Sequence, residues 1–196
     1  MVDTWNKKVK VNKQMVPKKK VLSYYRKLWN KSPGFRSLLK KKGAFIRATY
    51  DGKVIIKRRK IKFNNWDDVE EAIKEHSVEF HIPVNKLKYK SYIDIDMPKK
   101  YGSDKQRIAR SIVSRLKKHK TNIAMVVDSP HGIHIFSNTS KQKLVKSLNE
   151  VASEDKRLMV GKSSSSKITL DPHEPNTAIP ESLSYKGTPY RKWKKI

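Results

Sequence analysis

The chain has 196 residues, 36% of them hydrophobic, which is enough for one compact domain with a sizeable core. It carries 46 lysine and arginine residues against 18 aspartate and glutamate residues, and its net charge of +28 predicts a polyanionic partner, nucleic acid above all. The absence of cysteine excludes disulfides, thiolate catalysis and cysteine-based zinc sites, and the absence of a long apolar run argues against membrane association.

The first third of the chain predicts a basic arm followed by helices and a hairpin. Residues 1–20 are rich in lysine and are expected to form a mobile basic arm, with an unstructured terminus without a role as the alternative. Apolar residues at helical spacing predict a helix over residues 21–29, which Ser32-Pro33-Gly34 ends. Alternating runs around Asp51-Gly52 predict a β-hairpin within residues 44–60. Asn64 or Asn65 should begin the next helix, which would bury Val69, Ala72 and Ile73.

The segment Tyr-Ile-Asp-Ile-Asp, residues 92–96, is predicted to be a strand that carries chemistry. Residues two apart on a strand share a face, so Asp94 and Asp96 point together while the two isoleucines point into the opposite layer. Like charges so close resist ionising together unless a cation lies between them. The pattern therefore predicts a platform for a divalent metal, although two surface acids paired with nearby lysines would have the same spacing.

The remainder of the chain alternates helices with strands. Ser103 and Gln106 suggest a capping box for a helix, and residues 122–127 and 131–137 suggest a strand and its antiparallel return. Thr139 should cap a further helix, and a short strand over residues 168–170 ends at Asp171. This succession predicts an α+β fold with one mainly antiparallel sheet and flanking helices. The inward apolar residues of the two helices are Ile108, Ile112, Val113 and Leu116, then Leu144, Leu148 and Val151.

Four acids remain after those of turns and helix starts are set aside: Asp94, Asp96, Asp128 and Asp171. All lie within or at the end of a predicted strand, which can hold a carboxylate rigidly enough to bind a metal. A second group of polar residues surrounds a tight turn. There His134 shares a strand face with Gly132, and Ser129 is placed to donate to a phosphate, although an isolated strand histidine is commonly structural.

Taken in order, three segments resemble the catalytic motifs of the archaeo-eukaryotic primase superfamily: residues 92–96, residues 129–134 and residues 167–171. The similarity extends over residues 24–188. Within it, residues 179–188 are similar to the family's Leu-Pro-Gly-Ser-Leu-His-Gly-Lys-Thr-Gly segment, with Glu181 in place of a glycine. The resemblance implies a single primase-polymerase catalytic domain over residues 21–196, with the RRM-like core of archaeo-eukaryotic primases.

The resemblance also implies an activity and its site. The activity would be template-directed nucleotidyl transfer by a DNA primase or primase-polymerase, with two Mg²⁺ or Mn²⁺ ions held by Asp94, Asp96 and Asp171. Ser129, His134 and Lys186 would contact the incoming nucleotide. Predicted nucleic-acid contacts, chosen from the basic segments, are Arg58, Arg59, Arg107 and Arg110.

The expected partners are a single-stranded or primed DNA template and nucleoside triphosphates, with a large primase subunit or a helicase as further candidates. Residues 1–20 hold no apolar core of a secretory signal, so a cytoplasmic protein is expected, of viral, plasmid or archaeal origin. Two alternatives stay open: a metal-dependent nuclease, which would use the same carboxylates, and a non-enzymatic basic nucleic-acid-binding protein. The sequence leaves open the choice between ribonucleotides and deoxyribonucleotides, and whether Asp128 assists or replaces Asp171.

Overall fold

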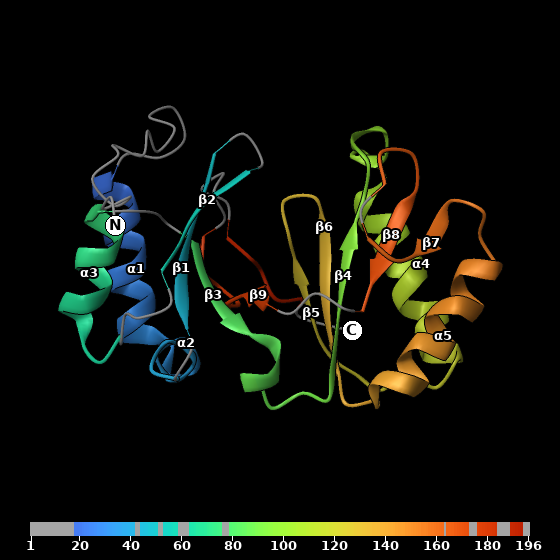
Figure 1. Cartoon of the computed structure of the whole chain (residues 1–196), viewed down its shortest axis with the longest axis horizontal. Coiled ribbons are helices and arrows are strands. Elements are labelled where there is room, and N and C mark those ends of the chain that lie inside the picture. The colour runs from blue at the N-terminus through green and yellow to red at the C-terminus, as the bar shows by residue number, and fades with distance from the viewer. Residues whose placement is uncertain are drawn as a thin grey trace, which may run out of the picture.

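Two β-sheets lie between two groups of helices in this computed structural model (Figure 1). It describes residues 18–41, 44–50, 53–58, 63–75, 79–162, 164–172, 176–183 and 189–193. The α+β class and the mainly antiparallel pairing agree with the sequence prediction, but the expectation of one sheet is wrong. Within the described ranges, every helix is too short or too polar to cross a bilayer.

The first sheet and its helices come mainly from the N-terminal part of the chain. Its strand order is β2-β1-β3-β9, so the last strand returns from the far end of the sequence. Helices α1, α2 and α3 cover one face of this sheet and enclose a core that includes Tyr25, Phe35 and Phe80. The elements are α1 (Lys18–Lys31), α2 (Pro33–Leu39), β1 (Phe45–Tyr50), β2 (Lys53–Arg58), α3 (Trp66–Glu75), β3 (Glu79–Pro83) and β9 (Asn176–Ala178).

The second sheet has the order β5-β6-β4-β8-β7, with β7 parallel to β8 and the other pairs antiparallel. Without the edge strand β7, the chain order β4-α4-β5-β6-α5-β8 with this pairing is the βαββαβ arrangement of RRM-like folds, as the resemblance implied. The elements are η1 (Val84–Lys86), β4 (Ser91–Asp96), η2 (Lys99–Tyr101), α4 (Lys105–Lys118), β5 (Ile123–Asp128), β6 (Gly132–Ser137), α5 (Lys141–Ser153), β7 (Leu158–Val160) and β8 (Ile168–Asp171).

Apolar residues on alternate strand positions divide the interior into three clusters. Ile93 and Ile95 pack with α4 and α5 on the outer face of the second sheet. The opposite face of that sheet carries Tyr92 and Phe136, which pack with Ala178 of β9 in the first sheet. The space between the sheets is therefore filled by a small apolar cluster beside the polar residues described below.

The helices were mostly predicted at their observed places, but one was missed. Ser32 does not simply end a helix: its hydroxyl accepts from the Phe35 N–H at 3.2 Å and caps α2, with Pro33 in the first turn. A proline is favourable there because the first helical N–H groups have no partner within the helix. The hairpin β1–β2 and the α3 cap at Asn65 agree with prediction.

Two predicted caps in the second half are wrong. Asp104 rather than Ser103 occupies the N-cap position of α4, its carboxylate accepts from Arg107, and Gln106 donates to Asp128 at 2.9 Å. Ser140, not Thr139, precedes α5, because the Thr139 hydroxyl accepts from the Asn122 N–H at 2.7 Å. In both cases a contact with another element takes the side chain away from the helix end.

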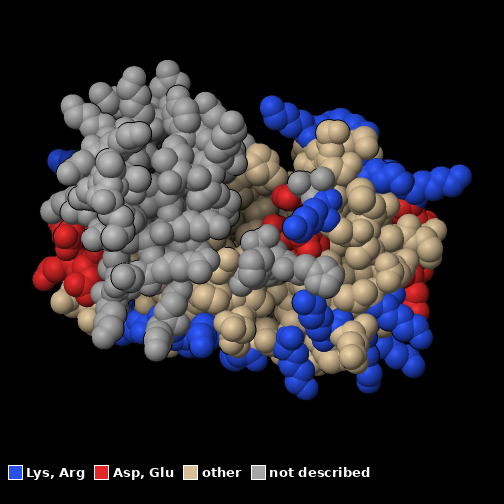
Figure 2. Space-filling view, viewed as in Figure 1, with Lys and Arg blue, Asp and Glu red and all other residues tan. Residues whose placement is uncertain are grey.

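Lysine and arginine atoms are scattered over the lower and right-hand parts of the described surface in Figure 2, in keeping with the large positive net charge. Acidic atoms are visible in a hollow between the two halves of the molecule in the same view. The excess of basic over acidic residues would attract a polyanion to the protein.

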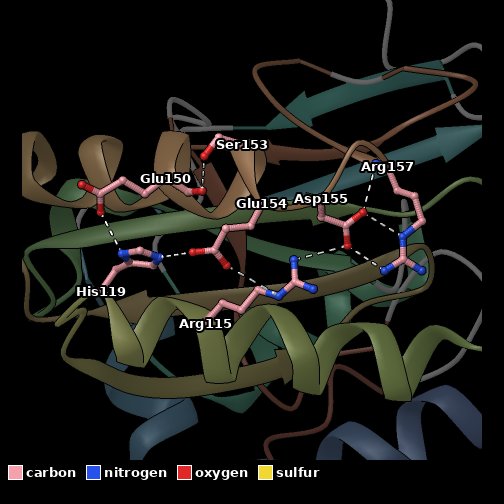
Figure 3. Close-up of polar contacts among 7 residues, drawn as sticks. All are labelled: Arg115, His119, Glu150, Ser153, Glu154, Asp155 and Arg157. Carbon is pink, nitrogen blue, oxygen red and sulfur yellow. Dashed lines mark hydrogen bonds and ion pairs between the residues drawn. The ribbon is translucent and has the colours of Figure 1, made fainter.

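A chain of ion pairs fastens α4 to the end of α5 and to the segment before β7 (Figure 3). The two ring nitrogens of His119 lie 2.9 Å from Glu150 and 2.7 Å from Glu154. Further along, the Asp155 carboxylate lies between Arg115, at 3.4 Å, and Arg157, at 2.6 Å. The alternating charges join elements that the apolar cluster beneath them already packs together.

Acid should weaken this junction through Asp155. Hydrogen bonds from Arg157 lower the pKa of Asp155 to about 2, so its stabilising contribution is complete above its unfolded pKa and is lost as the pH falls toward 2. Asp155→Asn is expected to lower the free energy of unfolding by about 1 kcal/mol at pH 7 and to make little difference near pH 2. Urea unfolding at both pH values measures this, and an equal loss at both would contradict the role of the charge.

Candidate active site

The register of β4 with its two neighbours aligns three polar residues in one row across the second sheet. Asp94 lies opposite His134 of β6 on one side and opposite Asp171 of β8 on the other. Side chains of directly opposite residues lie on the same face of an antiparallel sheet, with Cβ atoms about 5 Å apart. Asp96 lies two residues further along β4 and so joins the same face. The three carboxylates predicted to act together therefore occupy one patch.

This patch faces the first sheet. Ile93 and Ile95 point the other way, into the cluster beneath α4 and α5. The hollow between the two halves in Figure 2 is lined in part by acidic atoms, as expected for carboxylates on the inner face. The Asp94 side chain keeps 25% of its surface exposed, whereas that of His134 keeps only 9%. The acids are thus reachable from solvent, and the imidazole lies deeper.

The electrostatic environment raises the pKa of Asp96. Burial is the main cause, since it penalises the charged carboxylate. The neighbouring Asp171 raises the pKa further, while His131 acts in the opposite sense. Mutual repulsion between Asp96 and Asp171 is what two carboxylates that share a site should show.

His134 is enclosed by protein groups on every side. Its Nε2 lies 3.4 Å from Asp94 Oδ1, and its Nδ1 lies 3.4 Å from the Thr177 hydroxyl. The ring stacks on Tyr190, with centroids 5.4 Å apart, and meets the Tyr92 ring edge-on. Burial, followed by the charge of His81, lowers the pKa of His134 to about 3, so the imidazole is neutral at physiological pH.

The turn between β5 and β6 lies at the end of the patch where Asp96 is. Ser129 closes it, because its Oγ accepts from the Gly132 N–H at 3.0 Å and its own N–H donates to the Gly132 carbonyl at 3.1 Å. The ammonium of Lys105 donates to the Ser129 carbonyl oxygen from the first turn of α4. Ser129 is therefore held at the rim of the patch, 8% exposed.

Asp128 lies away from the other three acids. Strand alternation places it on the α4 side of β5, where its Oδ1 accepts from Gln106 at 2.9 Å and from the Trp193 indole N–H at 3.1 Å. Its carboxylate supports the start of α4 and the C-terminal segment. The acid that lies directly opposite Asp94 is Asp171 of β8, not Asp128.

The donor set fits a divalent cation in chemistry and backbone placement, since carboxylate oxygens are the ligands that Mg²⁺ and Mn²⁺ prefer. The raised pKa of Asp96 near a second carboxylate also favours a site that a cation would stabilise. The side chains themselves are not gathered into a cage: within the ranges that the structure describes, no three histidine or acidic side chains converge closely enough to hold a metal ion.

The predicted nucleic-acid contacts are dispersed. Arg107 and Arg110 are exposed on α4, which covers the face of the second sheet opposite the carboxylates, and Arg107 pairs with Asp104 at 2.9 Å. Arg58 ends β2, and Arg59 lies outside the described residues, as does the predicted nucleotide contact Lys186. Arg107 and Arg110 therefore lie away from the carboxylate patch.

Glu181 stands where the family segment that residues 179–188 resemble has a glycine, and the structure gives a reason for this difference. Its φ of 73° is in the left-handed region, which glycine adopts without strain, and glycine is the family's residue at this position. Here the glutamate gains contacts that a glycine lacks: its carboxylate accepts from Ser32 at 3.1 Å and from Lys192 at 3.0 Å. The side chain thereby ties α2 to the C-terminal segment.

Sequence reasoning missed a polar group on β3 and in the C-terminal segment. Glu79 and His81 are 3% and 4% exposed, and the Tyr190 hydroxyl donates to Glu79 Oε1 at 2.5 Å. The sequence pattern that could have revealed this group is the alternation of Glu79 and His81 with Phe80 and Ile82. It indicates a strand with one polar face and one apolar face.

Comparison with known proteins supports the fold. No family model matches the sequence, and no curated protein matches it. Among solved structures, the chain is similar to the polymerase domain from Mycobacterium tuberculosis Ligase D in complex with DNA, with a TM-score of 0.59 and 11% identity over 90% of this chain and 80% of that one. At this identity the similarity concerns the fold alone: the chain is similar in fold to that domain.

Proposed function

We propose that this protein is a template-directed nucleotidyltransferase of the primase-polymerase type. The observation that carries the proposal is the row Asp171–Asp94–His134, with Asp96 beside it, on the inner face of an RRM-like sheet. The fold similarity to a polymerase domain and the resemblance of the three motifs to those of primases support the same reading. The first sheet covers this face in part and leaves the carboxylates accessible.

Asp94, Asp96 and Asp171 would hold two Mg²⁺ or Mn²⁺ ions. When bound, the ions would make a 3′ hydroxyl nucleophilic and neutralise the charge of the leaving pyrophosphate. The contribution of the chain itself is to fix three carboxylates on two adjacent, hydrogen-bonded strands. Fixed ligands spare the site the free energy of reorganising them during the reaction.

Ser129, His134 and Lys186 stay the proposed contacts for the triphosphate. The contact of Ser129 with Gly132 uses Oγ as an acceptor, so the hydroxyl keeps its own hydrogen to donate to a phosphate oxygen. His134 is neutral and offers one N–H, so its effect on a phosphate would be hydrogen bonding rather than charge. In this mechanism the imidazole would therefore contribute by positioning the triphosphate and not by its charge.

A primed or single-stranded DNA template is the proposed macromolecular substrate. The net charge of +28 would draw a polyanion to the surface and make binding strongly salt-dependent. We keep Arg58, Arg59, Arg107 and Arg110 as proposed backbone contacts. Their distribution over separate elements suggests that they would bind phosphates along the template rather than take part in chemistry.

The test is a gel assay with a primed and an unprimed template, each nucleotide type in turn, and Mg²⁺ or Mn²⁺. Primer extension that requires nucleotides and is lost in EDTA is the expected result. Shortening of the primed template without nucleotides would instead identify a metal-dependent nuclease. Template binding that persists in EDTA with no change in product length would identify a non-enzymatic nucleic-acid-binding protein. The unprimed and nucleotide arms settle initiation and sugar preference.

A further inference from the structure

A buried acid lies on the first sheet, opposite the candidate site. Glu79 is 3% exposed and shares its strand face with His81, which is 4% exposed and whose Nε2 lies 3.6 Å from Glu79 Oε2. Ala178, the register partner of His81, packs with Tyr92 and Phe136, so this face looks toward the second sheet. Removing a carboxylate from water costs several kcal/mol unless other groups compensate, so its retention here calls for a reason.

Tyr190 connects this acid to the candidate site. Its hydroxyl donates to Glu79 Oε1 at 2.5 Å, and its ring stacks on His134 with 28° between the ring planes. The backbone of Tyr190 is also fixed, because its N–H donates to the Ser182 carbonyl and its carbonyl accepts from the Glu181 N–H, both at 2.9 Å. Tyr190 is thus a rigid link between β3 and the imidazole.

The contacts of His134 depend on the orientation of its ring. Its Nε2 edge faces Asp94, with Nε2 3.4 Å from Oδ1. Its Nδ1 edge faces the Thr177 hydroxyl, also at 3.4 Å. A ring rotation about χ2 would exchange these two edges. Tyr190, stacked on one face of the ring, opposes that rotation.

We propose that Glu79 and Tyr190 are positioning residues of the candidate site, which hold the His134 ring with its Nε2 edge toward Asp94 and its Nδ1 edge toward Thr177. Groups that fix the orientation of a site residue are often worth about ten- to a hundredfold in affinity or activity. In this arrangement the first sheet is a functional part of the site and not only a cover. The effect on activity rests on the proposed nucleotidyl transfer, whereas the orientation of the ring does not.

Tyr190→Phe is the central variant, because it keeps the stacked ring and removes the hydroxyl. We expect the nucleotide KM to rise about tenfold, because His134 is a proposed triphosphate contact, with the affinity for Mn²⁺ changed less than about twofold. Glu79→Gln keeps an oxygen that can accept from Tyr190 and should retain most of the activity, whereas Glu79→Ala should resemble Tyr190→Phe. The matched control is Tyr89→Phe, since Tyr89 packs on Phe136 in the same cluster and should behave as wild type.

A purely structural role predicts a different pattern. All variants would then unfold at lower urea concentration, while the folded fraction kept the wild-type kcat and nucleotide KM, and that result would overturn the proposal. Glu79→Gln as damaging as Glu79→Ala would also overturn it, because the hydrogen bond to Tyr190 would then not be what matters.

A second measurement is independent of any activity. Long-range ¹H–¹⁵N spectra of the imidazoles, with His134 assigned by comparison with His134→Asn, should show one sharp set of His134 ring signals in the wild type and shifted or broadened signals in Tyr190→Leu. No change in a folded Tyr190→Leu would overturn the proposal. If the expected spectra are found and the wild-type protein incorporates no nucleotide, the proposed function fails and the positioning of His134 stands. If Tyr190→Leu does not fold, Tyr190→Phe and Glu79→Gln decide between the two outcomes.

Discussion

Asp94→Asn should reduce the rate of primer extension by about a thousandfold or more. The asparagine keeps the size of the side chain and removes the negative charge from the centre of the row, where Asp94 lies between His134 and Asp171. A neutral amide is a poor ligand for Mg²⁺ or Mn²⁺. Template binding should stay near the wild-type value, because one unit of charge is a small part of +28. Extension on a gel and fluorescence anisotropy with labelled template measure the two quantities.

Asp104→Asn is the matched control for this experiment. Asp104 is exposed at the start of α4 and pairs with Arg107, outside the carboxylate patch, so the same chemical change there should leave extension unaltered. Asp96→Asn should behave like Asp94→Asn. If either Asp94→Asn or Asp96→Asn extended the primer as fast as the wild type, the assignment of these residues as metal ligands would be wrong. The proposed enzymatic role would then fail as well.

Gly132→Ala should prevent the candidate site from forming. A Cβ on Gly132 would lie 1.6 Å from the Ile95 carbonyl oxygen and 2.8 Å from its carbonyl carbon, and backbone atoms of a central strand cannot move aside cheaply. We expect a loss of about 3 kcal/mol or more in the free energy of unfolding, or no soluble protein. Urea unfolding followed by circular dichroism measures the loss.

Gly34→Ala provides the comparison for Gly132→Ala. No atom lies within 4 Å of the position where its Cβ would be, and Gly34 is in the helix α2. Alanine is the better helix former, so stability should be unchanged or higher by up to about 1 kcal/mol. Equal stability of the two alanine variants would show that β4 and β6 can separate, contrary to the close approach described here.

The candidate site was largely predictable because its residues follow from strand alternation. The spacing of Asp94 and Asp96 places them on one face whatever the partners of the strand are. The alignment with Asp171 could not be derived from local pattern, because it depends on which strands pair, and it was expected only through the motif resemblance. The structure then brings all three to one patch.

Other features depended on contacts between distant segments and were missed for that reason. The pairing of β3 with β9 joins Ile82 to Thr177 and adds a strand from the far end of the sequence to the first sheet, which local periodicity does not indicate. Gln106 and Thr139 carry the right side chains for helix caps but form hydrogen bonds with other elements instead. Local propensity gives way in each case to a partner that only the folded chain provides.

The position of β4 in its sheet has a consequence for motion. Because β4 is hydrogen-bonded to β6 on one side and to β8 on the other, the backbone that carries Asp94 and Asp96 cannot fray as an edge strand can. Exposing those amides to solvent requires breaking two ladders at once, which approaches the cost of global unfolding. Any rearrangement that accompanies substrate binding is therefore expected in the elements around the site, while the carboxylate platform itself stays still.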